Sequence, residues 1–374
     1  MHQSRMRAAI VREAGTRFEM SDVEISQPVA DEILVRILGV GICHSDIAAA
    51  EQQLPFPVPA ILGHEGAGII EAVGPDVRQL APGDHVVLTF NSCGACRYCA
   101  RGEPAYCAQF GPLNLGGARN DGSHAVHDGV GRPIASNFFG QSSFGEFAIA
   151  RERNAVKVPA DVPLELLGPL GCGVQTGAGA VMRSMAVTAG SSLLVLGAGT
   201  VGLAAVMAGV VQGCSQILVS EPHAARRALA VELGATHSID PLSGNFAGKL
   251  REILPDGVDF AFDTTARADV IADALSCLAS RGTLGLVGVP TDPGTAFKAN
   301  LLDLTGRGLT VRGICEGDSD PQSFIPQLVE LYRQGRLPLD RIVARYPLEN
   351  INEAVAHQLS GVCVKPVLLP KGSI

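Results

Sequence analysis

The stretch LLVLGAGTVGLAAV, residues 193–206, decides how the middle of this chain folds. Its glycines, Gly197, Gly199 and Gly202, have the spacing G-x-G-x-x-G. An apolar run precedes them and a run of helical composition follows, which predicts a buried strand, a tight turn and a helix. The N-terminus of such a helix offers unpaired N–H groups and a positive dipole end to phosphates. The stretch therefore predicts a dinucleotide-binding site.

Each glycine has a distinct physical task in that arrangement. Gly197 allows the tight turn, and Gly199 lets the backbone approach the pyrophosphate of the cofactor. Gly202 allows the helix to pack closely on the strand. The motif alone is weak evidence in a chain with 44 glycines. The alternatives are a domain of the same fold that binds no cofactor and one that binds a flavin.

The next expected strand, QILVSE, ends in an acidic residue, Glu221, 19 residues after Gly202. A carboxylate about 20 residues after the motif accepts hydrogen bonds from the adenosine ribose. It also repels a 2′-phosphate, which favours NAD over NADP. Arg226 and Arg227 follow closely and oppose that preference, and Arg226 is a candidate cofactor contact.

Secondary-structure patterns on either side of this stretch differ. Residues 5–95 contain short strands punctuated by turn residues, which is typical of a sandwich or a partly open barrel. Residues 108–140 are rich in Gly, Asn and Asp and predict a long surface loop. From about residue 175, strands and helices alternate, which predicts a parallel sheet with right-handed crossovers. KPVLL, residues 365–369, is expected to be a last strand.

These patterns predict an α/β protein of two domains. Residues 1–173 and 317–374 are expected to form a β-rich domain. Residues 174–316 are expected to form a doubly wound parallel sheet that is inserted into it. The chain has 374 residues, which is long enough for two domains and a large core.

Composition excludes several classes of protein. The formal charge of −8 and the lack of a basic run argue against nucleic-acid binding. The N-terminal sequence has no apolar segment of a signal peptide, so we expect a cytoplasmic protein. The apolar residues 193–211 contain several glycines and are better explained as a strand and a buried helix than as a membrane span. Ten cysteines then indicate metal or thiol chemistry rather than disulfides.

A cysteine-dense lobe, residues 93–107, contains Cys93, Cys96, Cys99 and Cys107 in a C-x2-C-x2-C-x7-C spacing. Two-residue gaps let cysteines converge on one tetrahedral zinc ion, and four thiolates leave no open position, which is typical of a structural site. An iron–sulfur cluster is the alternative. Its fourth cysteine normally follows three residues after the third and precedes proline, which is not the case here.

A second candidate metal set is scattered along the chain. Cys43 lies in GICHSD, His64 and Glu65 in LGHEGAG, and Cys172 in LGCGVQTG. Two thiolates and one imidazole with an open fourth position are typical of a catalytic zinc site. A buried cysteine is often only a small apolar residue, so spacing alone leaves that alternative open for Cys172.

Longer motifs carry a family resemblance over nearly the whole chain. They are GICHSD, GHEGAGIIEAVG, PGDHVVL, the four-cysteine lobe, GCGVQTGAGAV, GAGTVGL and ELGATHSID. With them the chain resembles the zinc-dependent medium-chain alcohol dehydrogenases. EPAYC and GQSSFGEFAIA are most similar to the aryl (benzyl) alcohol dehydrogenases. The resemblance implies a GroES-like catalytic domain, a Rossmann cofactor domain, NAD, one catalytic and one structural zinc per chain, and a homodimer or homotetramer.

The resemblance also implies roles around the catalytic zinc. Cys43, His64 and Cys172 would hold the ion. Glu65 would lie beside it as a transient fourth ligand, or as an ordinary neighbouring acid. Asp46 would orient the ligand imidazole of His64 and raise its basicity. Its alternative role is to cap a helix that starts at SDIAAAEQ.

Other positions match cofactor and substrate contacts of the family. Ser45 would place its hydroxyl against the substrate oxygen. His44 and Lys365 would contact the cofactor pyrophosphate, and Thr176 and Val201 would flank the nicotinamide. The expected substrate cleft, with core packing as the alternative for each residue, comprises Thr89, Phe138, Phe139 and Val289.

The implied reaction converts a primary alcohol and NAD into an aldehyde and NADH. Zinc lowers the pKa of the alcohol, and Ser45 relays the proton outward. Many relatives pass that proton to a histidine three positions later, where this chain has Ala48. Thr89 stands where relatives often carry an aromatic residue, which leaves width for aromatic or allylic alcohols. The alternatives are a glutathione-dependent formaldehyde dehydrogenase, an aliphatic alcohol dehydrogenase, and a non-catalytic zinc- or nucleotide-binding relative.

Overall fold

The computed structural model describes residues 4–371, which divide into two compact units. The β-rich unit comprises the chain through Cys172 and again from Asp320. The parallel-sheet unit comprises Gly173–Ser319. The sequence places the corresponding boundaries at 173/174 and 316/317. The chain therefore leaves the first unit once and returns to it, as the expected insertion requires.

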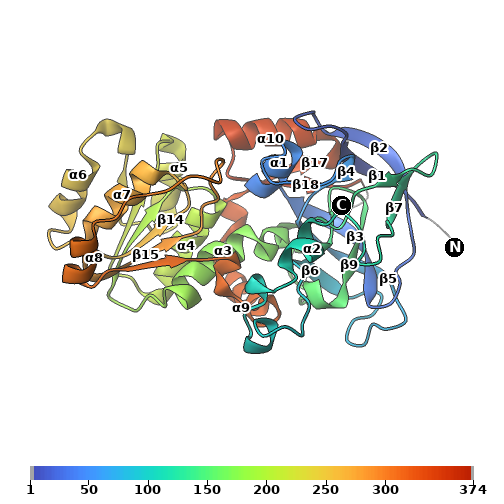
Figure 1. The fold of residues 1–374 in the computed structure, drawn as a ribbon, viewed down its shortest axis with the longest axis horizontal. Helices are drawn as coiled ribbons and strands as arrows, with labels where there is room; N and C mark the ends of the chain where they lie inside the picture. Colours follow the sequence, from blue (N-terminus) through green and yellow to red (C-terminus); the bar gives the residue numbers. More distant parts are fainter. Residues whose placement is uncertain (1–3, 372–374) are drawn as a thin grey trace. The chain divides into compact units, whose positions relative to one another are not determined.

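Two sheets build the described part of the β-rich unit (Figure 1). The first has the order β4 (Ala60–Ile61), β1 (Ser4–Val11), β2 (Glu19–Ile25), β7 (Val126–Asp128) and β8 (Pro133–Ile134). The second has the order β10 (Ala155–Lys157), β6 (His85–Leu88), β5 (Glu65–Val73), β3 (Glu32–Gly41), β18 (Lys365–Leu369) and β17 (Val343–Pro347), and β9 (Phe147–Arg151) also pairs with β3. Its α-helices are α1 (His44–Ala50), α2 (Phe110–Leu115), α9 (Pro321–Arg333) and α10 (Ile351–Ser360). The expected all-β pattern of residues 5–95 is confirmed apart from the short α1.

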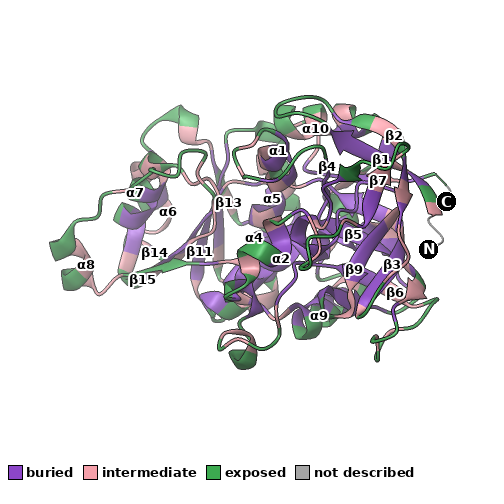
Figure 2. Cartoon of the chain, turned by 45° about the vertical axis from the view of Figure 1, so that its right-hand side comes forward, coloured by how far each residue is buried: buried purple, intermediate pink, exposed green. Residues whose placement is uncertain are grey.

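Strand β3 organises the second sheet, because it pairs with β5, β9 and β18. Its sequence EILVRILGVG is apolar almost throughout, as a strand buried on both faces requires, and Figure 2 shows β3 and β5 largely buried. The C-terminal strand β18 joins antiparallel to it, with Val367 opposite Gly41. The predicted last strand is thus confirmed, and it brings the end of the chain to the segment that precedes α1.

The parallel-sheet unit contains a six-stranded sheet within the described residues. The strand order is β13 (His237–Ile239), β12 (Gln216–Ser220), β11 (Ser192–Leu196), β14 (Val258–Asp263), β15 (Leu278–Leu286) and β16 (Thr310–Gly313). Every neighbouring pair is parallel. The helices of this unit are α3 (Gly173–Gly179), α4 (Thr200–Gln212), α5 (Ala224–Glu232), α6 (Phe246–Ile253), α7 (Ala268–Cys277) and α8 (Leu301–Arg307). Ranked along the chain, the order is 3-2-1-4-5-6, so the strand order reverses between β11 and β14 and the doubly wound sheet is confirmed.

The segment 108–140 differs from the expected surface loop. It contains α2 and the hairpin of β7 and β8, and β7 extends the first sheet by pairing with β2. Leu113, Ile134 and Phe138 are buried. The Gly- and Asn-rich composition reflects the turns between these short elements. The apolar residues between the turns pack in the core of the unit.

Among residues 4–371, none of the helices combines the length and the apolar character that a membrane crossing requires.

Candidate active site

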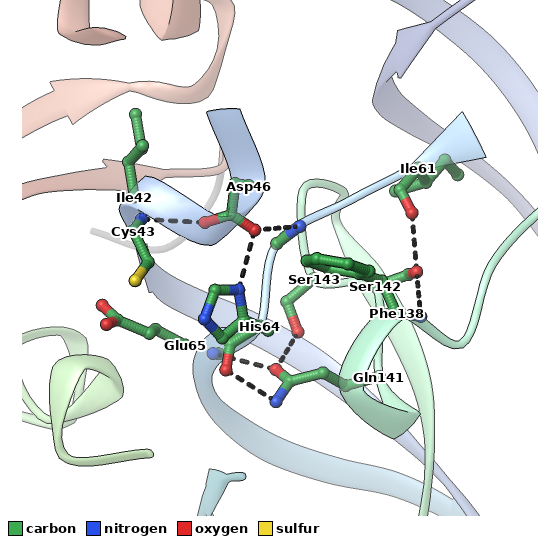
Figure 3. Close-up of polar contacts among 12 residues, drawn as sticks. Ile42, Cys43, Asp46, Ile61, His64, Glu65, Phe138, Gln141, Ser142 and Ser143 are labelled. Atoms are coloured by element: carbon green, nitrogen blue, oxygen red, sulfur yellow. Dashed lines mark hydrogen bonds and ion pairs between the residues drawn. The ribbon is translucent and has the colours of Figure 1, made fainter. Parts of the chain in front are cut away.

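A cluster of possible metal ligands lies in the β-rich unit, and all of its members except the half-buried Cys43 are buried. The ligand atoms of Cys43, His64, Glu65 and Cys172 all lie within 4.8 Å of one another. Cys43 is the residue before the first turn of α1, and Glu65 begins β5 with His64 just before it. Cys172 follows a short 3₁₀ turn, Gly168–Gly171. The fold thus brings together four groups from three segments that are far apart in the sequence, and Figure 3 shows three of these groups.

The carboxylate of Asp46 braces this cluster (Figure 3). One oxygen, Oδ1, lies 2.8 Å from Nδ1 of His64 and accepts the backbone N–H of Gly63 at 3.0 Å. The other oxygen, Oδ2, accepts the backbone N–H of Cys43 at 2.8 Å. The expected contact with His64 is therefore present. The helix begins at His44, so Asp46 stabilises its first turn as the third helical residue rather than as the cap.

The imidazole of His64 is oriented for a metal. Its Nδ1 faces Asp46, and its Nε2 is buried without a hydrogen-bond partner among the described residues. A buried nitrogen in that state is costly unless it is a ligand. A hydrogen bond with the Cys172 thiol and, against the effect of burial, the charge of His64 hold the pKa of Cys43 well below its usual range. A thiolate and an oriented imidazole are the donors that zinc prefers, so the residues present fit that ion.

Glu65 forms a buried ion pair with Lys365, whose Nζ lies 2.9 and 2.8 Å from its two carboxylate oxygens. The same Nζ donates to the backbone oxygen of Ile42 at 2.8 Å, and the two charged side chains are at most 1% exposed. Gly41 leaves room for Glu65, because a Cβ there would collide with its carboxylate. Burial raises the pKa of Glu65 to about 7, although the Lys365 ammonium opposes the shift.

This ion pair engages Lys365, which the family resemblance places at the cofactor pyrophosphate. An ammonium has three hydrogens, and those of Lys365 are directed at Ile42 and Glu65. The expected contact with a cofactor pyrophosphate stays a prediction, and in this structure Glu65 and Ile42 take up the ammonium of Lys365. The reason is strand pairing: β18 places Lys365 beside the end of β3, where Glu65 is the uncompensated buried charge.

Aromatic rings pack around the imidazole of His64. Phe139 stacks on it with ring centroids 4.5 Å apart and planes inclined by 25°, and Phe138 meets it edge-on at 5.4 Å. Both phenylalanines are buried, so they pack in the core and border the metal cluster at once. Further rings in contact with these two, which the sequence did not single out, are Phe56 and Phe110.

Two other predicted cleft residues behave differently. Thr89 is buried, and its hydroxyl donates to the backbone oxygen of Gly171 at 2.7 Å, next to Cys172. Val289 is 77% exposed and belongs to the parallel-sheet unit, so the alternative of core packing is wrong for it. Its place at the substrate stays a prediction.

Gln141 is a positioning residue that sequence reasoning missed. Its amide nitrogen donates to the backbone oxygen of His64 at 2.9 Å, and its amide oxygen accepts from Gly66 at 3.0 Å and from Ser143 at 2.7 Å. Figure 3 shows this side chain beneath the imidazole. The only sequence signal was a polar residue inside the motif GQSSFG, whose burial no pattern revealed.

The four-cysteine lobe is assembled as a second cluster, and its sulfur atoms all lie within 4.8 Å of one another. Backbone N–H groups point at the sulfurs, for example that of Cys96 at Cys93 and that of Gln109 at Cys107, each at 3.3 Å. Such donors stabilise thiolates, and the N–H groups of Cys99 and Ala108 lower the pKa of Cys96 to about 6. Four converging sulfurs fit one tetrahedral zinc ion.

In the parallel-sheet unit, the motif glycines form the predicted strand, turn and helix. Gly197 follows β11 directly and has φ +97°, which an L side chain adopts only with strain. A Cβ on Gly202 would collide with the backbone oxygen of Gly197, whereas nothing lies within 4 Å of the position of a Cβ on Gly199. That open side at the N-terminus of α4 is a cradle in which a pyrophosphate fits.

Glu221 lies at the end of β12 beside this turn. Its carboxylate accepts the backbone N–H of Ala198 at 2.8 Å and that of His223 at 2.9 Å. Arg227 donates instead to the backbone oxygen of Glu221 and pairs with Asp240. Of the remaining predicted cofactor contacts, Val201 is half-buried in the first turn of α4, Arg226 is half-buried in α5, and His44 and Ser45 lie in the first turn of α1.

Known proteins share this fold and these motifs. Residues 29–160 match the alcohol dehydrogenase GroES-like domain family, and residues 200–334 match the zinc-binding dehydrogenase family. The chain is 48% identical to geraniol dehydrogenase of Castellaniella defragrans over 363 residues, which cover 97% of each protein. The chain belongs to the zinc-dependent medium-chain alcohol dehydrogenase family. The family and the two-domain α/β fold predicted for this alcohol dehydrogenase are therefore confirmed.

Solved structures agree with this membership. The benzyl alcohol dehydrogenase of Acinetobacter calcoaceticus is 42% identical to this alcohol dehydrogenase, with a TM-score of 0.95 over 98% of this chain and 99% of that one. An alcohol dehydrogenase zinc-binding domain protein from Burkholderia ambifaria is 50% identical, with a TM-score of 0.97 over the same shares.

Replacement of Asp46 by Asn tests the bracing of His64. The change removes the negative charge that keeps the imidazole a strong donor, so we expect zinc affinity at the Cys43 cluster to fall about 10- to 100-fold. Competition with a chromophoric chelator measures this, and the four-cysteine lobe is the internal reference. Asp76→Asn, at an exposed carboxylate, is the control. Unchanged affinity would show that Asp46 serves only the first turn of α1.

Proposed function

We propose that this alcohol dehydrogenase oxidises primary allylic or aromatic alcohols to aldehydes with NAD, reversibly. The observation that carries the proposal is the convergence of the ligand atoms of Cys43, His64 and Cys172 in a chain of this family. These three residues would hold the catalytic zinc, and Glu65 lies near enough to act as an occasional fourth ligand. Zinc bound there supplies a Lewis acid that lowers the pKa of an alcohol. The cysteines of residues 93–107 would hold a second, structural zinc.

The chain's own residues would perform the remaining tasks. Asp46 fixes the ring of His64 and raises its basicity. Phe138 and Phe139 exclude water from the neighbourhood of the imidazole, which strengthens electrostatic interactions there. Ser45 would receive the alcohol proton. It lies in the first turn of α1, two residues after the candidate ligand Cys43.

NAD would bind to the parallel-sheet unit. The open turn at Gly199 and the N-terminus of α4 support a pyrophosphate site. Glu221 supports NAD rather than NADP, because a buried carboxylate beside the turn would repel a 2′-phosphate. Arg226 and Arg227 were the argument for NADP, since basic groups can bind a 2′-phosphate. Arg227 instead donates to backbone oxygens, which weakens that argument.

The proposed substrate class has two supports. The relatives reported above include proteins named geraniol dehydrogenase and benzyl alcohol dehydrogenase. The aromatic rings around His64 offer apolar, flat surfaces that suit planar unsaturated groups. A glutathione-dependent or aliphatic activity is the competing assignment. A glutathione adduct would require basic groups for its carboxylates, and the rings around His64 do not offer them.

A substrate panel tests this assignment. With zinc-loaded enzyme and NAD, we expect kcat/KM for benzylic and allylic primary alcohols to exceed that for saturated alcohols of equal carbon number by about 10- to 100-fold. NADP in place of NAD should lower kcat/KM by a similar factor. Equal rates with saturated alcohols, or a preference for the glutathione–formaldehyde adduct, would contradict the proposed substrate class.

The route by which the alcohol proton reaches solvent also distinguishes this chain from many of its relatives. Position 48 lies one helical turn after Ser45 and carries alanine, so α1 offers no imidazole for a relay there. The proton would therefore leave through ordered water, or from the cofactor ribose directly to solvent.

The variant Ala48→His tests whether that path limits the rate. A neutral imidazole at position 48 can accept the proton above a pKa near 6.5, so we expect alcohol oxidation to rise roughly tenfold at pH 8, with a new ionisation in the pH profile of kcat/KM. Ala48→Gln is the control of similar size that does not titrate. An unchanged profile and rate would show that proton exit does not limit the reaction.

We also propose that the protein is a homo-oligomer joined through β16. All four residues of this edge strand are exposed, and an edge strand presents unpaired N–H and C=O groups that can pair with another chain. Leu301 and Leu302 on neighbouring α8 are 74% and 78% exposed, and Figure 2 shows exposed residues along that helix.

The molecular mass in solution tests this proposal. Light scattering after size exclusion should give a multiple of 38.8 kDa, and Val311→Lys should shift the measured mass toward that of the monomer. A monomeric wild type would contradict this.

A further inference from the structure

A strained turn follows β16 in the parallel-sheet unit. Three consecutive residues, Glu316, Gly317 and Asp318, have φ values of 49°, 69° and 49°. Glycine tolerates this left-handed region, but Glu316 and Asp318 occupy it only with backbone strain. Such strain persists only where the surroundings enforce it, and it concentrates at functional sites.

Contacts with α3 and its continuation enforce the turn. A Cβ on Gly179 would lie 2.5 Å from the backbone oxygen of Gly317, and one on Gly317 would lie 2.5 Å from that of Gln175. Both positions therefore require glycine, and the two segments touch through their backbones. Asp318 accepts a hydrogen bond from the hydroxyl of Ser184 at 2.6 Å. The turn is thus held at both its backbone and one carboxylate.

The held turn directs one further carboxylate at the predicted cofactor contact Thr176. The hydroxyl of Thr176 donates to Oε2 of Glu316 at 3.3 Å. The next residue, Gly177, packs so closely on α4 that a Cβ there would collide with the backbone oxygen of Val201. Glu316 and Thr176 are therefore tied to the first turn of α4, at the end where the cradle lies.

Sheet topology indicates which half of a dinucleotide reaches this carboxylate. In a parallel sheet of order 3-2-1-4-5-6, the cofactor crosses the carboxyl edge where the order reverses, here between β11 and β14. Glu221 follows β12 and marks the adenosine half. Glu316 follows β16, on the opposite half of the sheet, where the nicotinamide end would lie.

The charge of the ring then determines what a carboxylate does there. The nicotinamide ring of NAD⁺ is cationic and that of NADH is neutral, so a fixed negative charge stabilises the oxidised form selectively. We propose that Glu316 belongs to the cofactor site and that its charge shifts the relative affinity of the site toward NAD⁺ and away from NADH, which favours alcohol oxidation and release of the reduced cofactor. This inference rests on the proposed NAD-dependent function.

Binding measurements on the zinc-loaded enzyme test it. Glu316→Gln keeps the size of the side chain and an oxygen for Thr176 but removes the charge. We expect the Kd of NAD⁺ to rise about tenfold while that of NADH changes less than about twofold. The Kd of NADH is measured from its fluorescence, and the Kd of NAD⁺ is measured from its competition with NADH. Glu316→Asp, which retains the charge, should restore most of the preference for NAD⁺.

Asp318→Asn is the matched control, since it removes a charge that holds the turn through Ser184. It should change both constants by the same factor, as a merely structural role predicts. If Glu316→Gln also changes both equally, or changes neither, the inference is wrong and the proposed function stands. If the wild type binds neither form of the cofactor, the proposed function itself fails.

Discussion

The β-rich unit depends on compensating charges that it buries completely. Glu65, Lys365, Asp46 and His64 are each at most 1% exposed. Moving one such ion out of water costs several kcal/mol, so each must find a partner. Glu65 takes Lys365, and Asp46 takes His64 and two backbone N–H groups. Removal of one partner would leave a buried charge unpaired, at a cost of about 3–5 kcal/mol.

These pairs also connect elements that are remote in sequence. The Glu65–Lys365 pair joins β5 to β18, and the Asp46 contacts join α1 to the segment before β5. The thiols of Cys43 and Cys172 lie beside this network, so the groups that stabilise the unit also shape the candidate zinc site. Stability and chemistry here depend on the same hydrogen bonds. That dependence explains why so much polarity is retained in an otherwise apolar core.

Local signals predicted much of this protein. The glycine spacing at 197–202 and the cysteine spacing at 93–107 each act over one turn or one lobe, and both were recognisable from sequence. Hydrophobic periodicity likewise identified the strands and helices around the glycines. The scattered set of Cys43, His64 and Cys172 was different, since spacing alone could not separate a ligand from a buried apolar cysteine. Family resemblance, and then geometry, brought those residues together.

By itself, the sequence determined the two-unit α/β plan, the glycine turn and the four-cysteine lobe. Each depends on residues close together in the chain, whose backbone preferences and spacing act locally. Only the tertiary structure decided that Lys365 pairs with Glu65, 300 residues away, and that Glu316 meets Thr176 through a strained turn. Both results follow from which strands and helices lie side by side. A buried charge takes the partner that packing places within reach, and no local pattern records that choice.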